Sequence, residues 1–325
     1  MTTLFVTEQG CRLVRRGYAI LGYKNREKLF MYPLENVRQI VIMGRVEVSS
    51  SLLGLLMVRG VDTVFLSRYG RFKGRVSAGA GKNILIREKQ FQRRSEPSFA
   101  LQFCRSLVRA KILNSRNLIR KQRPNLAEEM KPRLENALRS IQRAGSLNAL
   151  RGLEGAFATL YFQKFPQLLK ETFGFTRRIK HPPPDPLNIL FSLGYTLLFN
   201  SVYALVEAAG LDPYAGFFHQ ARYGHPALVS DLMEPYRAPL VDRLVIRLIN
   251  NGKISKEHFR KGESRSEMEE TALKMFISGY QERLFSRFSR NSVRETTWNL
   301  LQKDVWQFQK HLEGETDEFK PYIFR

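Results

Sequence analysis

The first 76 residues divide into short segments whose composition favours β-strands. Each is rich in β-branched and aromatic side chains, and Gly, Asn or Pro separates most of them. The segments cover residues 4–9, 11–16, 18–23, 28–33, 39–44, 46–49, 61–67 and 71–76. Residues 50–59 are the exception and have the character of one short helix. Strands this short, with turn residues between them, predict small antiparallel sheets.

The rest of the chain has the pattern of helices. From about residue 84 onwards, apolar side chains recur at helical spacing. Residues 77–83 (SAGAGKN) are the predicted linker. Gly81-Lys82 superficially matches a phosphate-binding loop, but Val76 and Asn83 stand where that motif requires Gly and Ser or Thr. We therefore predict an α+β protein of two domains: a small N-terminal antiparallel β domain (residues 1–80) and a larger all-α domain (residues 81–325).

The excess positive charge lies in the first half of the chain. The net charge is +23, and residues 1–150 hold 29 basic against 10 acidic side chains. Cations that neutralise phosphates release counterions, so nucleic acid is the favoured partner. A solvated helix face is the alternative interpretation for each single residue. The basic residues along the first long helices are Arg87, Lys89, Arg93, Arg94, Arg105, Arg109, Lys111, Arg116, Arg120, Lys121 and Arg123.

Residues 210–242 concentrate the side chains that are suited to chemistry. His219 is followed by Asp231 and Glu234, which are three apart on a predicted helix and are expected on one of its faces. Two carboxylates there would repel each other unless a cation lay between them. Carboxylates with a histidine form an oxygen-rich ligand set that suits Mg²⁺ or Mn²⁺. A solvated helix face and a histidine used in packing remain the alternatives.

A further acid, Glu154, lies upstream on a predicted helix. Ser146 is a plausible N-cap, and an apolar stripe continues to Tyr161. Glu154 is at the edge of this stripe, where a carboxylate is costly unless it is paired or bound to metal. Gly152 and Gly155 beside it leave room for a close approach to the helix. Crowding of small residues against a neighbouring helix is the competing explanation.

Other sequence features carry little functional signal. Cys11 and Cys104 are too few for a disulfide framework and are expected to be inert thiols. His181, His258 and His311 are expected in exposed surroundings. We identify neither an unbroken run of eighteen apolar residues nor a signal-peptide pattern, which favours a cytoplasmic protein without membrane association.

Several motifs resemble the CRISPR-associated spacer-acquisition endonuclease/integrase family, the catalytic subunit of CRISPR adaptation. The most specific are GLDPYAGFFH (210–219), DLMEPYRAPLVDRLV (231–245) and the LEG-x-A pattern around Glu154. The first domain adds the EQG turn (8–10), the Pro-Leu-x-x-Val-x-x-Ile-Val run (33–41) and the Gly-x-Phe-x-Gly-Arg close (70–75). The resemblance covers nearly the whole chain.

The resemblance implies a site and a reaction. Glu154, His219 and Glu234 would be the catalytic residues and the ligands of one Mg²⁺ or Mn²⁺ ion, with Asp231 as a possible second-shell acid. Water or a DNA 3′-hydroxyl would attack a phosphodiester there. Arg222 and Arg237 would hold the flanking phosphates. Tyr195 is either a core aromatic residue or a hydroxyl that reaches DNA. Many relatives carry Asp where Glu234 stands, which could change the distance to the metal.

The resemblance also implies partners. The helical domain would be the catalytic one, and the β domain would mediate dimerisation and partner contact. A homodimer would join a small dimeric adaptation partner protein, capture double-stranded DNA fragments and insert them into the CRISPR repeat array. Two alternatives stay open: a structure-specific nuclease that acts on branched DNA in repair, and a non-catalytic basic DNA-binding scaffold.

Overall fold

The computed structural model describes residues 2–68, 70–77, 83–179, 182–261, 266–290 and 293–324. The chain divides into two compact units, Met1–Ala80 and Gly81–Arg325. They are called the β unit and the helical unit below. Most of the predicted linker, including Gly81-Lys82, and also His181, lie outside the described residues.

The β unit contains two four-stranded sheets. In the first, the order is β1-β5-β7-β8, and in the second it is β4-β3-β2-β6. The strands are β1 (Thr2–Val6), β2 (Cys11–Arg16), β3 (Ala19–Lys24), β4 (Glu27–Pro33), β5 (Val37–Met43), β6 (Val46–Val48), β7 (Asp62–Leu66) and β8 (Phe72–Val76). Strands therefore form in every predicted segment, with a 3-10 turn at Leu34–Asn36 between β4 and β5.

The expectation of antiparallel sheets is wrong in part. β5 pairs in parallel with both β1 and β7, and β2 pairs in parallel with β6. The remaining pairs are antiparallel. Parallel neighbours need a crossover connection, and α1 (Ser50–Val58) lies in the connection from β6 to β7. Its N-cap is Ser49, whose side chain accepts a hydrogen bond from the Leu52 backbone.

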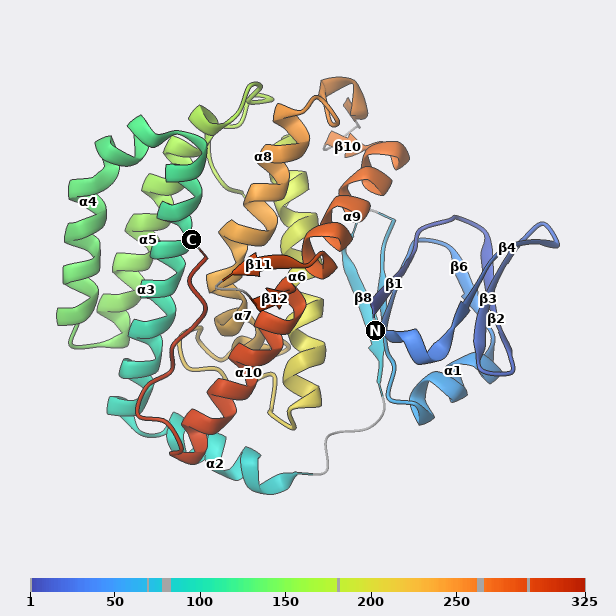
Figure 1. Ribbon diagram of the computed structural model, residues 1–325, viewed down its shortest axis with the longest axis horizontal. Helices are drawn as coiled ribbons and strands as arrows, with labels where there is room; N and C mark the ends of the chain where they lie inside the picture. The colour runs from blue at the N-terminus through green and yellow to red at the C-terminus, as the bar shows by residue number, and fades with distance from the viewer. Residues whose placement is uncertain are drawn as a thin grey trace. The chain divides into compact units, whose positions relative to one another are not determined.

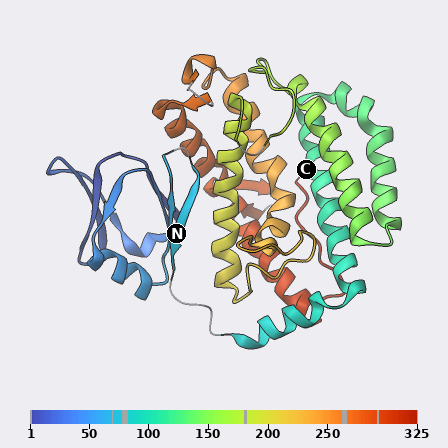
Figure 2. The same ribbon diagram turned by 180° about the vertical axis from the view of Figure 1, so that it is seen from behind.

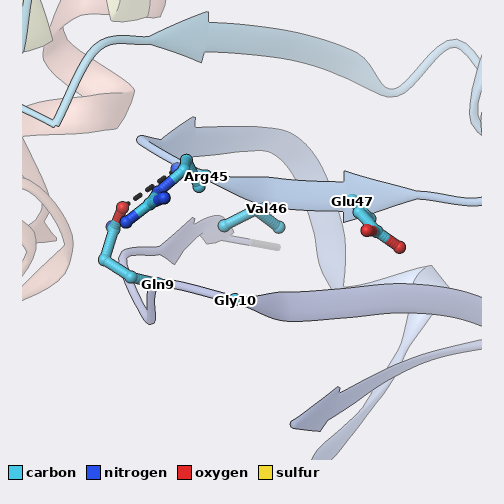
Figure 3. A pocket seen from close by; sticks show the side chains of 5 residues that line it. All are labelled: Gln9, Gly10, Arg45, Val46 and Glu47. Atoms are coloured by element: carbon cyan, nitrogen blue, oxygen red, sulfur yellow. Dashed lines mark hydrogen bonds between the residues drawn. The ribbon is translucent and has the colours of Figure 1, made fainter.

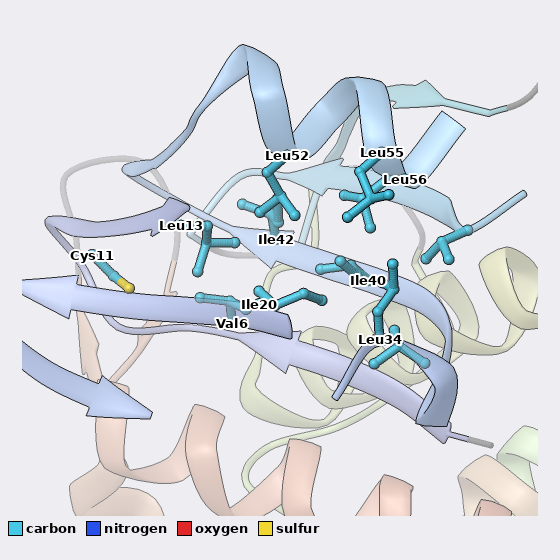
Figure 4. Close-up of a cluster of buried hydrophobic side chains, with 12 residues drawn as sticks. Val6, Cys11, Leu13, Ile20, Leu34, Ile40, Ile42, Leu52, Leu55 and Leu56 are labelled. Atoms are coloured by element: carbon cyan, nitrogen blue, oxygen red, sulfur yellow. The ribbon is translucent and has the colours of Figure 1, made fainter. Parts of the chain in front are cut away.

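One apolar core joins the strands and α1 (Figure 4). Leu13 and Ile20 reach it from the second sheet, Ile40 and Ile42 from the first, and Leu52 from the helix. All five side chains are buried, so this core accounts for the stability of the β unit by removing apolar area from water.

The EQG turn has a structural role in the β unit. The Gln9 side chain accepts a hydrogen bond from the Arg45 backbone at 2.9 Å (Figure 3). It also donates one to the Met43 carbonyl at 3.0 Å, so it ties the turn to the β5–β6 connection. Gly10 has a φ of +78°. The turn borders a pocket of about 450 Å³ lined by Gln9, Gly10, Arg45, Val46 and Glu47.

The helical unit is built from nine described α-helices. They are α2 (Ile84–Arg94), α3 (Pro97–Gln122), α4 (Pro124–Arg143), α5 (Leu147–Lys164), α6 (Pro186–Ala208), α7 (Ala227–Met233), α8 (Arg243–Asn250), α9 (Glu270–Phe285) and α10 (Thr297–Glu313). The 3-10 turns are η2 (Phe165–Leu168), η3 (Glu234–Tyr236) and η5 (Lys256–His258), and η4 (Arg237–Asp242) is a π-helix. Figures 1 and 2 show α3, α4 and α5 side by side.

The helical unit is not all-α as predicted. Two short antiparallel hairpins interrupt it, β9 (Phe259–Lys261) with β10 (Ser266–Met268), and β11 (Phe288–Arg290) with β12 (Val293–Glu295). Each strand has three residues, which is too short to leave a period-two pattern in the sequence.

Helix α6 is a long apolar helix of the helical unit. Its 23 residues are long and apolar enough, by length and composition, to cross a membrane. In the helical unit, however, 67% of the apolar window is buried, as in the core helix of a globular protein. Gly194 makes close packing possible, because a Cβ there would lie 2.4 Å from Val241 in η4. Helix α6 therefore packs directly against the segment that carries the candidate site.

Candidate active site

The candidate site is built around a change of helical pitch after α7. Pro235 lacks a backbone N–H, and the chain passes from α7 into the 3-10 turn η3 and then the π-helix η4. Local π-helical turns are frequent at functional sites. Asp231 and Glu234 both face the His219 ring, as their spacing predicts, but their other partners differ: the Asp231 carboxylate also contacts the backbone of residues 217–219, while Glu234 contacts Lys111 and Arg237.

Lys111 joins the two predicted acidic ligands. From α3 its ammonium group lies 2.6 Å from Oε2 of Glu234 and forms a second ion pair with Oε1 of Glu154 on α5. Burial alone would lower the pKa of Lys111, but the charges of Glu234 and Glu154 outweigh burial and raise it. One cation thus neutralises two carboxylates that lie 80 residues apart in the chain.

Arg237 neutralises Glu234 from the other side. Its Nη2 lies 2.9 Å from Glu234 Oε1, and its guanidinium group lies over the Tyr195 ring, 4.7 Å from the centroid. Burial would raise the pKa of Glu234, yet Arg237 and Lys111 lower it to about 2. Glu234 is therefore ionised at neutral pH although only 5% of its side chain is exposed.

His219 is oriented by Asp231. The fully buried Asp231 carboxylate accepts hydrogen bonds from the backbone N–H groups of Phe217, Phe218 and His219 at 2.7–3.0 Å. Its Oδ1 also lies 2.7 Å from His219 Nδ1. The other ring nitrogen, Nε2, faces Glu234 Oε1 at 3.8 Å. Asp231 thus fixes the loop and turns Nε2 towards the acids, as carboxylates behind metal-binding histidines do.

The glycines beside Glu154 leave open space, as the sequence suggested. Among the described residues, no atom of a neighbouring element lies within 4 Å of where a Cβ would stand on Gly152 or Gly155. Crowding against a neighbouring helix therefore does not explain these glycines. The surface of α5 around Glu154 is accessible for the approach of a ligand.

Tyr195 is a core residue, so of its two expected roles the structure supports the core aromatic residue and contradicts the hydroxyl that reaches DNA. Its side chain is buried, and its hydroxyl donates a hydrogen bond of 2.7 Å to Asp242 Oδ1. The Tyr161 hydroxyl donates to the other oxygen of Asp242 at 2.8 Å. Burial raises the pKa of Asp242 to about 6, against the lowering effect of both hydroxyls. The hydrogen bond to Asp242 holds the Tyr195 ring in place, and the Arg237 guanidinium group lies over this ring.

Several members of the predicted basic surface are used inside the helical unit. Lys111 belongs to the site, Arg87 donates to the Gly210 carbonyl at 3.2 Å, and Arg94 donates to the Gly216 carbonyl at 2.9 Å. Arg222, by contrast, is exposed on the turn next to His225.

The prediction for His311 is wrong, because its ring is buried and stacked on Phe99.

The donor set fits a divalent cation, although no preformed cage is present. Nowhere in the described ranges do three His, Cys, Asp or Glu side chains gather closely enough to hold a metal ion. Instead, the Lys111 ammonium contacts both carboxylates, and Glu234 faces His219 Nε2. Two carboxylates and one imidazole nitrogen around one bound cation are the ligands that Mg²⁺ or Mn²⁺ would use there.

Sequence reasoning missed three residues of the site. Lys111 was counted with the surface cations, and Tyr161 and Asp242 were not singled out. A usable signal existed for Lys111, because it interrupts a run of buried apolar residues on α3. A charged residue in such a run is buried only when it is paired.

Comparison with known proteins agrees with this fold. The family model described as CRISPR associated protein Cas1 matches residues 4–282. A CRISPR-associated endonuclease Cas1 from Thermus thermophilus is 36% identical over 302 residues, which cover 92% of this chain and 90% of that protein. A solved structure titled Cas6-RT-Cas1–Cas2 complex has a TM-score of 0.87 at 25% identity and covers all of this chain but 36% of that longer one.

A casposase bound to an integration product has the same fold, with a TM-score of 0.87 at 18% identity, covering 100% of this chain and 95% of that one. The family model and the curated relative define a CRISPR-associated protein. The chain belongs to the Cas1 family, as the resemblance of its motifs implied.

Proposed function

We propose that this protein is a metal-dependent DNA endonuclease/integrase that inserts foreign DNA fragments into a CRISPR repeat array. The observation that carries the proposal is that Glu154 and Glu234 both contact the Lys111 ammonium group, while His219 Nε2 faces Glu234. Membership of the Cas1 family supports the DNA substrate. The large positive charge of the chain supports it independently.

Glu154, His219 and Glu234 would hold one Mg²⁺ or Mn²⁺ ion. Such an ion, when bound, polarises a phosphodiester and stabilises the charge that builds on it during attack by water or a 3′-hydroxyl. Asp231 holds the imidazole so that Nε2 stays available. Glu234 is already ionised, so it can coordinate a cation without first losing a proton.

The cationic side chains would bind the DNA phosphates near the reacting bond. Arg237 lies beside Glu234 with 20% of its side chain exposed, and its guanidinium group can donate to a phosphate oxygen. Lys111, released from the carboxylates when a metal ion binds, would remain within reach of the same phosphate. Arg222 is exposed on the turn that precedes α7 and would hold a flanking phosphate.

We also propose that the protein acts as a homodimer with a small dimeric adaptation partner in the cytoplasm. The β unit would mediate these contacts, because its edge strands β4 and β6 each have one neighbour in their sheet. The structural relative whose title names a complex with Cas2 supports the class of partner.

Substitution of the acids tests the chemistry. Glu154→Gln, His219→Ala and Glu234→Gln should each abolish Mn²⁺-dependent cleavage of duplex DNA while DNA binding persists. The exposed Glu128→Gln is the matched control and should cleave normally. Normal cleavage by Glu154→Gln would remove that residue from the site. DNA binding without cleavage by the wild type at any metal concentration would favour the scaffold interpretation.

A further inference from the structure

The chain after α10 reaches back to the candidate site. Figure 1 shows this segment, residues 315–324, running beside α3. Phe319 anchors it in an aromatic cluster with Phe103 and Phe308, and the Phe319 side chain is 1% exposed. The rest of the segment contacts Tyr236 through Phe324 and shares the hydrogen-bond partner Asn114 with Pro235; these are the two residues between Glu234 and Arg237.

Asn114 links the segment to the backbone beside Glu234. Its side-chain amide donates to the Pro235 carbonyl at 2.8 Å and to the Tyr322 carbonyl at 3.0 Å. Its Oδ1 accepts a hydrogen bond from the Phe324 backbone at 2.8 Å. Asn114 is 1% exposed and lies one helical turn after Lys111 on α3. A single buried amide therefore holds the site backbone and the segment together.

Asp304 makes the second link. Its Oδ2 accepts hydrogen bonds from the Tyr236 hydroxyl at 2.7 Å and from the Tyr322 backbone N–H at 2.9 Å. The Phe324 ring packs edge-on against the Tyr236 ring, with the centroids 5.7 Å apart. Both residues between Glu234 and Arg237 are thus fixed by side chains that also bind residues 322–324.

We infer that residues 321–324 are a positioning element of the active site, which holds the turn carrying Glu234 and Arg237 through Asn114 and Asp304. The inference rests on the proposed function for its catalytic consequence. The turn departs from α-helical pitch and contains Pro235 and Pro239, so its own backbone hydrogen bonds hold it less tightly than those of a regular helix. External hydrogen bonds supply the missing constraint.

The inference has different consequences for the catalytic rate and for DNA binding. Loss of residues 321–324 leaves every proposed metal ligand and phosphate-binding side chain present, but lets the backbone that carries Glu234 move. Misplacement of reacting groups by about an ångström costs rate by large factors. We therefore expect a fall in kcat of about tenfold or more, with DNA affinity unchanged.

A shortened chain that ends at Lys320 tests the inference, with full-length Lys320→Ala as the control because this exposed side chain pairs with Glu318 on the surface. The shortened chain should lose kcat, keep its DNA affinity and show faster amide exchange at residues 236–242, while exchange in α4 stays slow. A synthetic peptide of residues 320–325 added in trans should restore both kcat and slow exchange.

Asp304→Ala provides a second variant, in which the chain keeps its length and loses one link. It should also lose kcat and keep its DNA affinity, with a smaller loss of kcat than the shortened chain. Asp304→Asn retains an acceptor oxygen and should restore slow amide exchange at residues 236–242. Unchanged kcat and exchange in the shortened chain would overturn the inference, as would a loss that reaches α4 and that the peptide does not reverse. A wild type that does not cleave DNA would refute the proposed function, while the exchange experiment would still test the positioning element.

Discussion

The Lys111 ammonium nitrogen lies 2.6 Å from Oε2 of Glu234, and the same nitrogen contacts Glu154. The position between two carboxylates is where a divalent cation would bind in the proposed mechanism. A buried ammonium that already neutralises these acids stabilises the fold, because two unpaired carboxylates in this position would repel each other. In the proposed mechanism, metal binding would therefore compete with the Lys111 ion pairs.

Lys111→Met should weaken the fold and strengthen metal binding. Removing one partner of a buried ion pair costs about 3 kcal/mol of unfolding free energy, while the freed carboxylates should bind Mn²⁺ at least tenfold more tightly. Urea unfolding without metal and calorimetric titration with Mn²⁺ measure the two effects. Lys131→Met, at an exposed ion pair with Glu128, is the matched control and should change neither. Mn²⁺ affinity that stays the same or falls in Lys111→Met would contradict the competition.

Asp304→Asn should change how stability depends on pH. Burial raises the pKa of Asp304 from 3.8 to about 7, although the Tyr322 N–H and the Tyr236 hydroxyl lower it. Between these values the unfolded chain has lost the proton and the folded chain keeps it. The contribution of Asp304 to the unfolding free energy therefore falls as pH rises from about 4 to about 7, by up to about 1.4 kcal/mol per pH unit, and is level above that.

The asparagine variant lacks this titration but keeps an acceptor for both hydrogen bonds. Its stability relative to the wild type should therefore be higher at about pH 8 than at about pH 5, as measured by urea unfolding at the two pH values. The raised pKa of Asp242 is common to both proteins and cancels in the difference. A difference that does not vary with pH would show that Asp304 does not titrate in this range.

Neighbouring cations on α3, α8 and α9 form the path that we expect for the DNA phosphates. Burial lowers the pKa of Lys121, and the neighbouring charges of Arg243, Arg120 and Arg283 lower it further. Phosphates bound there would relieve the repulsion between these cations.

Lys121→Gln and Arg243→Gln should each weaken DNA binding and reduce the slope of log affinity against log salt by about one. Lys274→Gln, on α9 in an ion pair with Glu270 at 3.0 Å, should leave the slope unchanged. Fluorescence anisotropy with duplex DNA over a range of salt concentrations measures the slopes. Equal slopes for all three variants and the wild type would show that DNA phosphates do not bind at Lys121 on α3 or Arg243 on α8.

The sequence predicted the positions of the strands but not their directions. Short segments rich in Val, Ile and Phe can be recognised locally in the sequence. The parallel pairing of β1 with β5, in contrast, joins Thr3 to Gln39, which are separated in sequence by β2, β3 and β4, so it depends on distant parts of the chain. The hairpin at Phe259–Met268 was missed because three-residue strands leave no alternation.

The site was predicted through its motifs, and its electrostatics were not. His219, Glu154 and Glu234 stand in recognisable patterns, but a lysine on a basic helix has the same local pattern whether it is solvated or buried. Only the packing of α3 against α5 and η3 shows that Lys111 points inwards. The spacing of Asp231 and Glu234 agrees with both acids facing His219, but it could not predict their different further partners, which depend on the change of pitch at Pro235.

The most direct test of the proposed function follows the fate of a DNA end. A duplex donor with free 3′-hydroxyls is incubated with repeat-bearing DNA, the small partner protein and Mn²⁺, and covalent products are separated on a denaturing gel. We predict that the donor is joined to the repeat, that a donor ending in dideoxynucleotides is not joined, and that Glu234→Gln joins neither. Cleavage of DNA without any joining, with the partner present, would contradict integration and favour a repair nuclease.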